Sequence, residues 1–184
     1  MQQLDIFDLL YPNFKFGEKI RVFEAFAGIG AQIKALKRLS QKYDIEIESV
    51  GISEIDKFAI QSYMAVHGKT KNYGDITKIN GKDLPQIDLF TYSFPCQDIS
   101  LAGNQEGFAK GSGTRSGLLW EVERILKEIE HKPKVLLMEN VKNLVSKKFF
   151  DDFLEWQHEL EHMGYTNYWQ VLNAKDYGIP QNRE

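Results

Sequence analysis

The chain has 184 residues and 42% apolar side chains, which fits one domain with a sizeable core and excludes a disordered or fibrous protein. Its formal net charge is -3, so any contact with nucleic acid must come from a local basic patch. The single cysteine, Cys96, can form neither an internal disulfide nor a multi-thiolate zinc site. Without a signal segment or a membrane-length apolar run, the chain is expected to be soluble and cytoplasmic, with no membrane or metal partner.

From Lys19 onward, short β-rich runs alternate with segments of helical period. This alternation predicts an α/β fold with a doubly wound, mostly parallel sheet and helices on both faces. The runs typical of strands are residues 20–26, 47–53, 87–94, 134–139 and 168–174. The segments of helical period are residues 31–39, 56–66, 118–126 and 149–163.

Two regions lie outside this alternation. Residues 1–18 are expected to form an N-terminal arm, followed by a catalytic domain over residues 19–184. The glycine-rich stretch 101–117 is long and helix-poor, which is typical of a functional lid. The chain ends directly after a predicted strand and turn, so the fold is expected to be incomplete at the C-terminus.

The first strand runs through Phe26 into a Gly28-Ile29-Gly30 turn and then a helix, which offers backbone N–H groups to an anion. Glu54 follows the second strand, where doubly wound folds place a ribose-binding carboxylate. Together these features indicate an adenosine-containing cofactor. A tight structural turn explains the glycines equally well, and Glu54 alone is compatible with an exposed strand-end acid.

Two further positions bear on the cofactor. Asp75 follows the second helix and can accept a hydrogen bond from an adenine amino group, although turn or helix-cap chemistry explains it too. Ile33 replaces the third glycine of the dinucleotide fingerprint, which disfavours a nicotinamide cofactor.

A thiol and a carboxyl group follow neighbouring predicted strands. Pro95 fixes the direction of the chain just before Cys96, so the thiol can reach a bound substrate, although a lone cysteine is often an inert core residue. Glu139 ends the next strand, where partial burial would favour its protonated form and a role as general acid; capping of the next turn is the alternative. This pair suits nucleophilic addition with proton assistance.

Seven segments in this order resemble the DNA (cytosine-5) methyltransferases, over residues 21–184. They are Phe26-Ala27-Gly28-Ile29-Gly30, Ser53-Glu54-Ile55-Asp56, Gly74-Asp75-Ile76, Phe94-Pro95-Cys96-Gln97, Arg115-Ser116-Gly117-Leu118, Glu139-Asn140-Val141 and the run from Asn173 to Arg183. The resemblance implies a Rossmann-like, S-adenosylmethionine-dependent methyltransferase fold. In that family Cys96 would add to cytosine C6, flanked by Pro95 and Gln97, and Glu139 would hold the ring at N3 and its amino group.

The resemblance also implies a cofactor and a partner. S-adenosylmethionine would be bound by Phe26, Gly28, Ile29, Gly30, Glu54, Ile55, Asp75, Ile76 and Leu118. Glu54 would take its ribose diol and Asp75 its adenine amino group. The substrate would be double-stranded DNA with the target cytosine flipped out, and Lys110 and Arg115 would meet phosphates.

The chain departs from the family pattern at three places. Glu24-Ala25 stands where a small polar or acidic residue followed by leucine is usual, and Ala31 replaces a frequent glycine. The last motif contains Arg183, but the chain ends before the second arginine of that motif. Because the target-recognition region is absent as well, we expect the chain to need the C-terminal half, or another copy, as a partner polypeptide.

A His-Glu-x-x-His zinc-protease pattern occurs at 158–162. Its helix has an apolar stripe at steps of three and four residues, which places His158 and His162 on the outer face. A charged helix surface is therefore favoured over a zinc site.

The leading interpretation is the catalytic half of a restriction-modification methyltransferase. The alternatives are an inactive or split-subunit fragment, a tRNA cytosine-5 methyltransferase on the same fold, and a nicotinamide-dependent Rossmann enzyme.

Overall fold

The computed structural model describes residues 17–100 and 106–184. The described chain divides into two compact units. Unit 1 contains residues 17–93 and 124–139, and unit 2 contains the described part of 94–123 together with 140–184. The predicted arm, except its last two residues, and residues 101–105 of the predicted lid lie outside the described residues.

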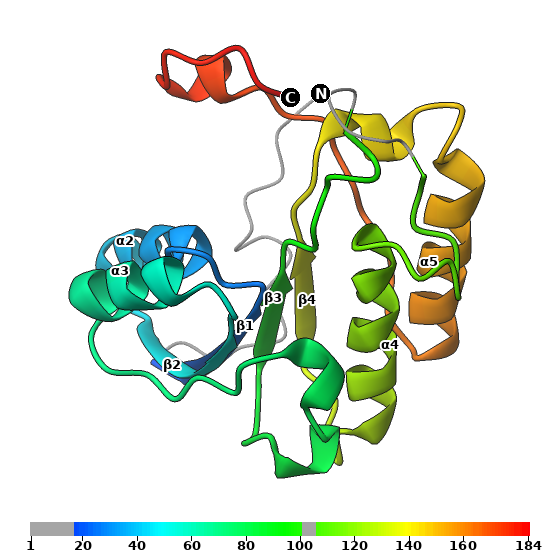
Figure 1. Cartoon of the computed structure of the whole chain (residues 1–184). Coiled ribbons are helices and arrows are strands. Elements are labelled where there is room, and N and C mark those ends of the chain that lie inside the picture. The colour runs from blue at the N-terminus through cyan, green and yellow to red at the C-terminus, as the bar shows by residue number, and fades with distance from the viewer. Residues whose placement is uncertain (1–16, 101–105) are drawn as a thin grey trace. The chain divides into compact units, whose positions relative to one another are not determined.

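Unit 1 contains a parallel four-stranded sheet (Figure 1). Its strands are β1 (Lys19–Ala25), β2 (Glu46–Ser53), β3 (Leu89–Tyr92) and β4 (Val135–Met138), in the order β2-β1-β3-β4. The chain winds outward from β1 to β2 and then returns to place β3 on the other side of β1. The switch point of this doubly wound sheet therefore lies between β1 and β3, where such sheets bind ligands beyond the carboxyl ends of their strands.

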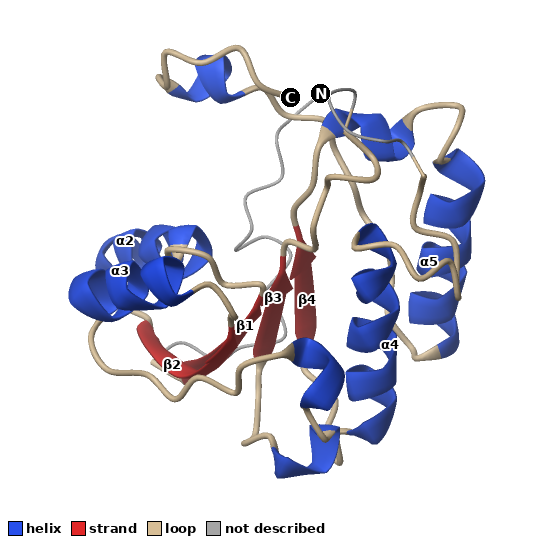
Figure 2. Cartoon of the chain, viewed as in Figure 1, coloured by secondary structure: helices blue, strands red, loops and turns tan. Residues whose placement is uncertain are grey.

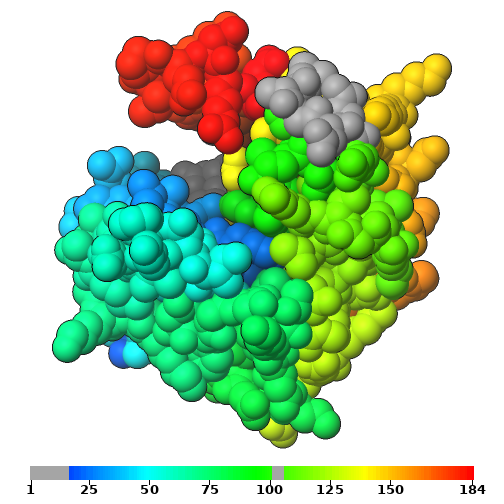
Figure 3. All heavy atoms as spheres, in the orientation of Figure 1, coloured from blue at the N-terminus to red at the C-terminus, as the bar shows by residue number. Residues whose placement is uncertain are grey.

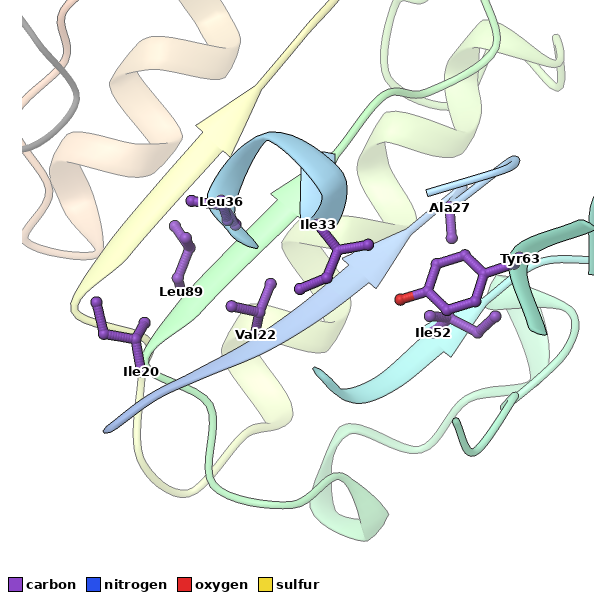
Figure 4. Packing of buried hydrophobic residues seen from close by; sticks show 8 residues of the cluster. All are labelled: Ile20, Val22, Ala27, Ile33, Leu36, Ile52, Tyr63 and Leu89. Atoms are coloured by element: carbon purple, nitrogen blue, oxygen red, sulfur yellow. The ribbon is translucent and has the colours of Figure 1, made fainter. Parts of the chain in front are cut away.

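One face of the sheet packs against helices α2 (Ala31–Tyr43) and α3 (Lys57–His67). Side chains alternate along a strand, so Ile20 and Val22 point to this face, where they belong to one apolar cluster with Ile33 of α2 (Figure 4). The whole cluster comprises Ile20, Val22, Ala27, Ile33, Leu36, Ile52, Tyr63 and Leu89. The other two long helices are α4 (Leu119–Glu128) and α5 (Phe150–His162). The described structure therefore contains four of the five predicted strands and all four predicted helices.

The aromatic side chains of β1 and β3 occupy the opposite face. Phe23 lies 5.1 Å from Phe90 and 5.7 Å from Tyr73 between ring centroids. The C-terminal half of α4 fixes the chain before β3: Arg124 donates to the carbonyl of Ile79, and Glu128 accepts from the N–H of Gly81. The segment that carries Asp75 is therefore anchored to a helix.

Unit 2, whose described regular structure is helical (Figure 2), has its own apolar core around α5. Trp120, in the first turn of α4, meets Trp156 of α5 edge to face with ring centroids 5.7 Å apart. Its indole N–H donates to the Phe108 carbonyl at 2.7 Å, so the described part of the glycine-rich stretch is tied to this core. The short helices of this unit are η3 (Ser116–Leu118), η4 (Lys142–Val145) and η5 (Ala174–Tyr177).

The expected orientation of α5 is confirmed. Phe153, Trp156 and Leu160 are buried, whereas His158 and His162 are exposed. Among residues 17–100 and 106–184, no group of three metal-binding side chains is found. None of the described helices is both long enough and apolar enough to span a membrane.

The predicted strand at 168–174 is wrong. In the structure this segment has no strand residues, and Tyr168, Trp169, Val171 and Leu172 are exposed. A β-rich sequence becomes a strand only where a neighbour accepts its backbone hydrogen bonds. Among the described residues the sheet consists of β1 to β4, and this segment pairs with none of them.

Candidate active site

The turn after β1 is held in a left-handed conformation at three residues. Phe26, Gly28 and Gly30 have φ angles of 55°, 54° and 81°. At Gly30 a Cβ atom would lie 2.5 Å from His67 Nε2 and 2.7 Å from Tyr63 Cε2, so only glycine fits. At Gly28 a Cβ atom would meet nothing within 4 Å, which leaves that side of the turn open. The glycines thus serve close packing at one position and access at the other.

Glu54 follows β2, and its carboxylate is fixed beside this turn by backbone donors. One oxygen accepts from Gly28 N–H at 2.8 Å, and the other accepts from Ile55 and Asp56 N–H at 2.8 Å each. A carboxylate has about four acceptor positions, so the half-buried group can still accept from a sugar diol. Ile29 and Ile55 are 62% and 75% exposed and offer apolar surface. These residues fit an adenosine group.

Asp75 caps the short helix η1 (Ile76–Lys78). Its Oδ1 accepts from the hydroxyl and the backbone N–H of Thr77, and these two bonds lower the pKa of Asp75. The cap chemistry weighed from the sequence is therefore present, and the side chain remains partly exposed for a ligand. Ile76 is 4% exposed, so its side chain belongs to the core and only its backbone is available to a cofactor.

Cys96 lies in unit 2 on the loop that leaves β3. The residue is half-buried, as is Pro95 before it, while Gln97 is exposed. The Cys96 carbonyl accepts from Ile99 N–H at 3.0 Å and from Ser100 N–H at 2.7 Å. These bonds curl the loop directly after the thiol.

The loop is braced by a serine and an aspartate. The Ser116 hydroxyl donates to the Pro95 carbonyl at 2.6 Å and accepts from Asp98 N–H at 3.3 Å. Asp98 in return accepts from Ser116 N–H at 2.9 Å. Both side chains are buried, at 0% and 6% exposure, so water cannot replace these bonds.

Two asparagines hold the same loop from the segment after β4. Asn140 donates to the Phe94 carbonyl at 3.0 Å, and Asn143 donates to the Ile99 carbonyl at 2.5 Å. Sequence reasoning gave no role to these asparagines, to Asp98 or to Ser116. Asn140 and Ser116 do lie in the segments that resemble the DNA (cytosine-5) methyltransferases, and this resemblance was the one indication of a role for them in the sequence.

Glu139 directly follows β4 in unit 1, and its N–H donates to the Tyr92 carbonyl at 3.1 Å. Its side chain is exposed, so the expected partial burial is wrong for this structure. The reason lies in the sheet: β4 is the last of the described strands, and all four of its residues are only half-buried.

The remaining predicted residues lie in unit 2. Leu118 is half-buried at the end of η3. Arg183 is exposed, and its carbonyl accepts from Ala174 N–H at 2.9 Å. Lys110 forms an ion pair with Glu123 at 2.8 Å, so it is engaged within the protein. The structure thus brings the residues of the turn together with Glu54 and Ile55 in unit 1, whereas Cys96, Leu118 and Arg183 belong to unit 2.

Known proteins that are similar in sequence to this chain are DNA methyltransferases. The family model described as C-5 cytosine-specific DNA methylase matches residues 20–184. The type II methyltransferase M2.ScrFI of Lactococcus lactis subsp. cremoris is 44% identical, over 90% of this chain and 59% of its own length. The orphan methyltransferase M.SssI of Spiroplasma monobiae is 38% identical, over 90% of this chain and 58% of its own length. The chain therefore spans less than two thirds of these relatives.

Solved structures give the same fold. The Dnmt2 methyltransferase of S. pombe superposes with a TM-score of 0.69 at 25% identity, over 89% of this chain and 46% of that chain. The Entamoeba histolytica methyltransferase EhMeth superposes with a TM-score of 0.70 at 20% identity, over 90% of this chain and 51% of that chain. The Rossmann-like methyltransferase fold expected from the sequence is confirmed, and the family implies S-adenosylmethionine as methyl donor. By the match over residues 20–184, the chain belongs to the C-5 cytosine-specific DNA methylase family.

Proposed function

We propose that this chain carries the cofactor site and the nucleophile of a DNA cytosine-5 methyltransferase of the restriction-modification type. The observation that carries the proposal is the Cys96 loop, which follows a strand beside the switch point of the sheet and is braced by the buried pair Ser116 and Asp98. An inert core cysteine needs no such loop. A nucleophile needs a fixed direction of approach.

Glu54 is the best-supported cofactor residue. We infer that its carboxylate, already oriented by three backbone donors, accepts the ribose hydroxyls of S-adenosylmethionine. Phe26, Gly28, Ile29 and Gly30 bound the cofactor at the open side of the turn. In this proposal Ile55 contributes apolar contact, Asp75 accepts from the adenine amino group beside Ile76, and Leu118 adds a further wall.

In the proposed reaction, the Cys96 thiolate adds to C6 of the cytosine and electron density moves to C5. Glu139 holds N3 and the amino group of the ring, which stabilises the developing charge. When bound, S-adenosylmethionine supplies an electrophilic methyl group, which C5 accepts. Loss of the C5 proton to a base then restores the ring double bond and expels Cys96.

The proposed substrate is double-stranded DNA. The family description names DNA, which favours DNA over tRNA for this chain. C6 is inaccessible inside a duplex, so the target base must be flipped out. The relatives are longer than this chain, and six large apolar side chains between 168 and 179 are exposed in unit 2. Both observations support the proposal that the chain works with a partner polypeptide: the C-terminal portion of a methyltransferase, or another copy.

The proposal is tested by methyl transfer from labelled S-adenosylmethionine to DNA. The chain is mixed with the C-terminal portion of the relative that is 44% identical to it. We expect transfer with the mixture, none with Cys96→Ser, and an intermediate rate with Glu139→Gln, which retains a hydrogen-bonding side chain. Full activity of Cys96→Ser would contradict the assigned nucleophile, and label in tRNA but not in DNA would contradict the substrate.

A further inference from the structure

A buried carboxylate on β1 lies close to the turn that carries Gly28 and Gly30. Glu24 is on β1, faces α2 and α3, and is 1% exposed. One of its oxygens accepts from the backbone N–H of Ile33, in the first turn of α2, at 3.0 Å. The other accepts from the Tyr63 hydroxyl of α3 at 2.5 Å. One side chain thus joins β1 to both helices that follow the turns of the cofactor site.

Tyr63 and His67 of α3 continue the contact to the turn itself. Figure 4 shows Tyr63 between Ala27 and Ile52 with its hydroxyl oxygen towards β1. The rings of Tyr63 and His67 are 4.8 Å apart, and both would clash with any side chain at Gly30. His67 Nε2 lies 3.1 Å from the carbonyl oxygen of Ile29. Gly30 is therefore packed directly on α3.

We propose that Glu24 and Tyr63 are positioning residues that set the affinity for S-adenosylmethionine without contacting it. Glu24 fixes the start of α2 through Ile33 and fixes α3 through Tyr63, and these two helices frame the turn at Gly28–Gly30. The inference rests on the proposed function, because it assigns the cofactor to this turn.

The energetic cost of this arrangement argues for a role beyond packing. Burial raises the pKa of Glu24, although the hydrogen bonds from Tyr63 and Ile33, and the charge of Lys37, act in the opposite direction. An apolar residue at this position would avoid that desolvation. It would also leave the buried Ile33 N–H and the Tyr63 hydroxyl with one partner fewer, so the turn would lose its fixed geometry.

The test compares two substitutions at the same position. Glu24→Gln keeps an acceptor for Ile33 N–H and places a donor against the Tyr63 hydroxyl, whereas Glu24→Leu removes both interactions at similar volume. We expect calorimetry on the 184-residue chain to give a Kd for S-adenosylmethionine within threefold of wild type for Glu24→Gln. For Glu24→Leu we expect a Kd at least tenfold higher. Tyr63→Phe, which removes a single hydroxyl, should fall between them.

A second readout is independent of the cofactor. Hydrogen exchange of the backbone amides of Gly30 and Ile33 should accelerate at least tenfold in Glu24→Leu and stay near wild type in Glu24→Gln. Ile20→Val serves as the control, because it alters the same core cluster on β1 without touching the brace. It should lower the unfolding midpoint while leaving both the Kd and the exchange of these amides unchanged.

Three outcomes decide the matter. A Kd for Glu24→Leu and Tyr63→Phe equal to that of Ile20→Val would overturn the inference and leave the proposed function intact. If Glu24→Leu does not fold, Tyr63→Phe carries the same comparison. A wild-type chain that exchanges as expected but binds no S-adenosylmethionine would overturn the proposed cofactor site, and with it the inference.

Discussion

The side chain of Glu54 is held in a fixed orientation at the proposed cofactor site. Its two oxygens accept three backbone N–H groups from two segments that are distant in sequence, so its orientation is set by the fold rather than by a ligand. Such preorganisation lowers the entropy lost on binding. Asp56, two residues further on, caps α3 by accepting from the N–H groups of Phe58 and Ala59, so the two acids have different roles.

Substitution of Glu54 should therefore affect binding more than stability. For Glu54→Ala we expect S-adenosylmethionine affinity to fall by about 1.5 to 3 kcal/mol, the value of a lost charged hydrogen bond. Asp56→Ala is the matched control, because it should lower stability by about 1 kcal/mol as a lost cap and leave affinity unchanged. Titration calorimetry measures the affinity, and scanning calorimetry measures the stability. Equal affinities of the wild-type chain for NAD and S-adenosylmethionine would contradict the cofactor assignment.

Ser116 provides the second test at this scale. Ser116→Ala removes the donor to the Pro95 carbonyl and the acceptor for Asp98 N–H, both at a buried position. We expect the free energy of unfolding to fall by about 1 to 3 kcal/mol and methyl transfer in the mixed assay to slow at least tenfold. Denaturant unfolding measures the free energy of unfolding, and the initial rate at saturating DNA measures methyl transfer. An unchanged rate of methyl transfer would show that the Cys96 loop does not need the Ser116 hydrogen bonds.

The sequence identifies the candidate residues for the proposed chemistry more readily than the residues that hold them in place. Cys96 and Glu54 follow strands, and a position after a strand can be read from local pattern. The hydrogen bond from Ser116 to Pro95 joins residues 21 positions apart, and that from Asn140 to Phe94 joins residues 46 positions apart. A local sequence pattern cannot predict pairs at such separations. The predicted partial burial of Glu139 is wrong, because Glu139 follows the strand at the edge of the described sheet. The sequence alone does not show which strand lies at the edge.

At the scale of elements, one ion pair fastens β1 to the segment that enters β3. Arg21 donates through its side chain and its backbone to the carboxylate of Asp88, at 2.7 to 3.0 Å. Asp88 is 2% exposed, and burial alone would raise its pKa. The bonds from Arg21 outweigh burial, and the net effect is a pKa below the ordinary value.

This lowered pKa has a defined consequence for stability. A carboxyl group with a lower pKa in the folded state stabilises the protein above its unfolded pKa of about 3.9, and this contribution disappears as pH falls through the folded value. Asp88→Asn should cost about 1.5 to 3 kcal/mol at neutral pH. As the pH falls below about 4, the free energy of unfolding of Asp88→Asn should also decrease less than that of the wild-type chain. Parallel pH profiles for the two proteins would contradict the coupling.

Secondary-structure elements were predictable from the sequence where the local apolar pattern alone determines them. The apolar spacing of α2 and α5 predicts both helices, because a helix satisfies its own backbone. The segment 168–174 has the composition of a strand, yet in the described structure it pairs with no strand of the sheet. Strand composition thus indicates a capacity to pair, and tertiary context decides whether pairing occurs.

At the scale of the whole molecule, the chain covers 59% of the relative that is 44% identical to it. The space-filling view shows the segment at the end of the chain, coloured red (Figure 3). In unit 2 the exposed large apolar residues near this end are Tyr168, Trp169, Val171, Leu172, Tyr177 and Ile179. Exposed apolar side chains of this kind favour association.

The isolated chain should therefore associate. We expect sedimentation velocity to show concentration-dependent oligomers and an apolar dye to bind. Addition of the C-terminal portion of the relative should reduce both effects. Trp169→Ser should also reduce them, while Phe58→Ser, at an exposed position of unit 1, should not. A strictly monomeric chain without dye binding would contradict a role for this surface in association.

The most direct test of the central claim maps a covalent bond. Duplex DNA with 5-fluorocytosine at the target site is incubated with S-adenosylmethionine, the chain and the C-terminal portion of the relative, and the adduct is digested and located by mass spectrometry. Fluorine at C5 leaves no proton to lose, so elimination stalls and the adduct persists. The proposed mechanism predicts an adduct on Cys96 that is absent in Cys96→Ser and requires S-adenosylmethionine. An adduct on another residue, or methylation that proceeds with Cys96→Ser, would contradict it.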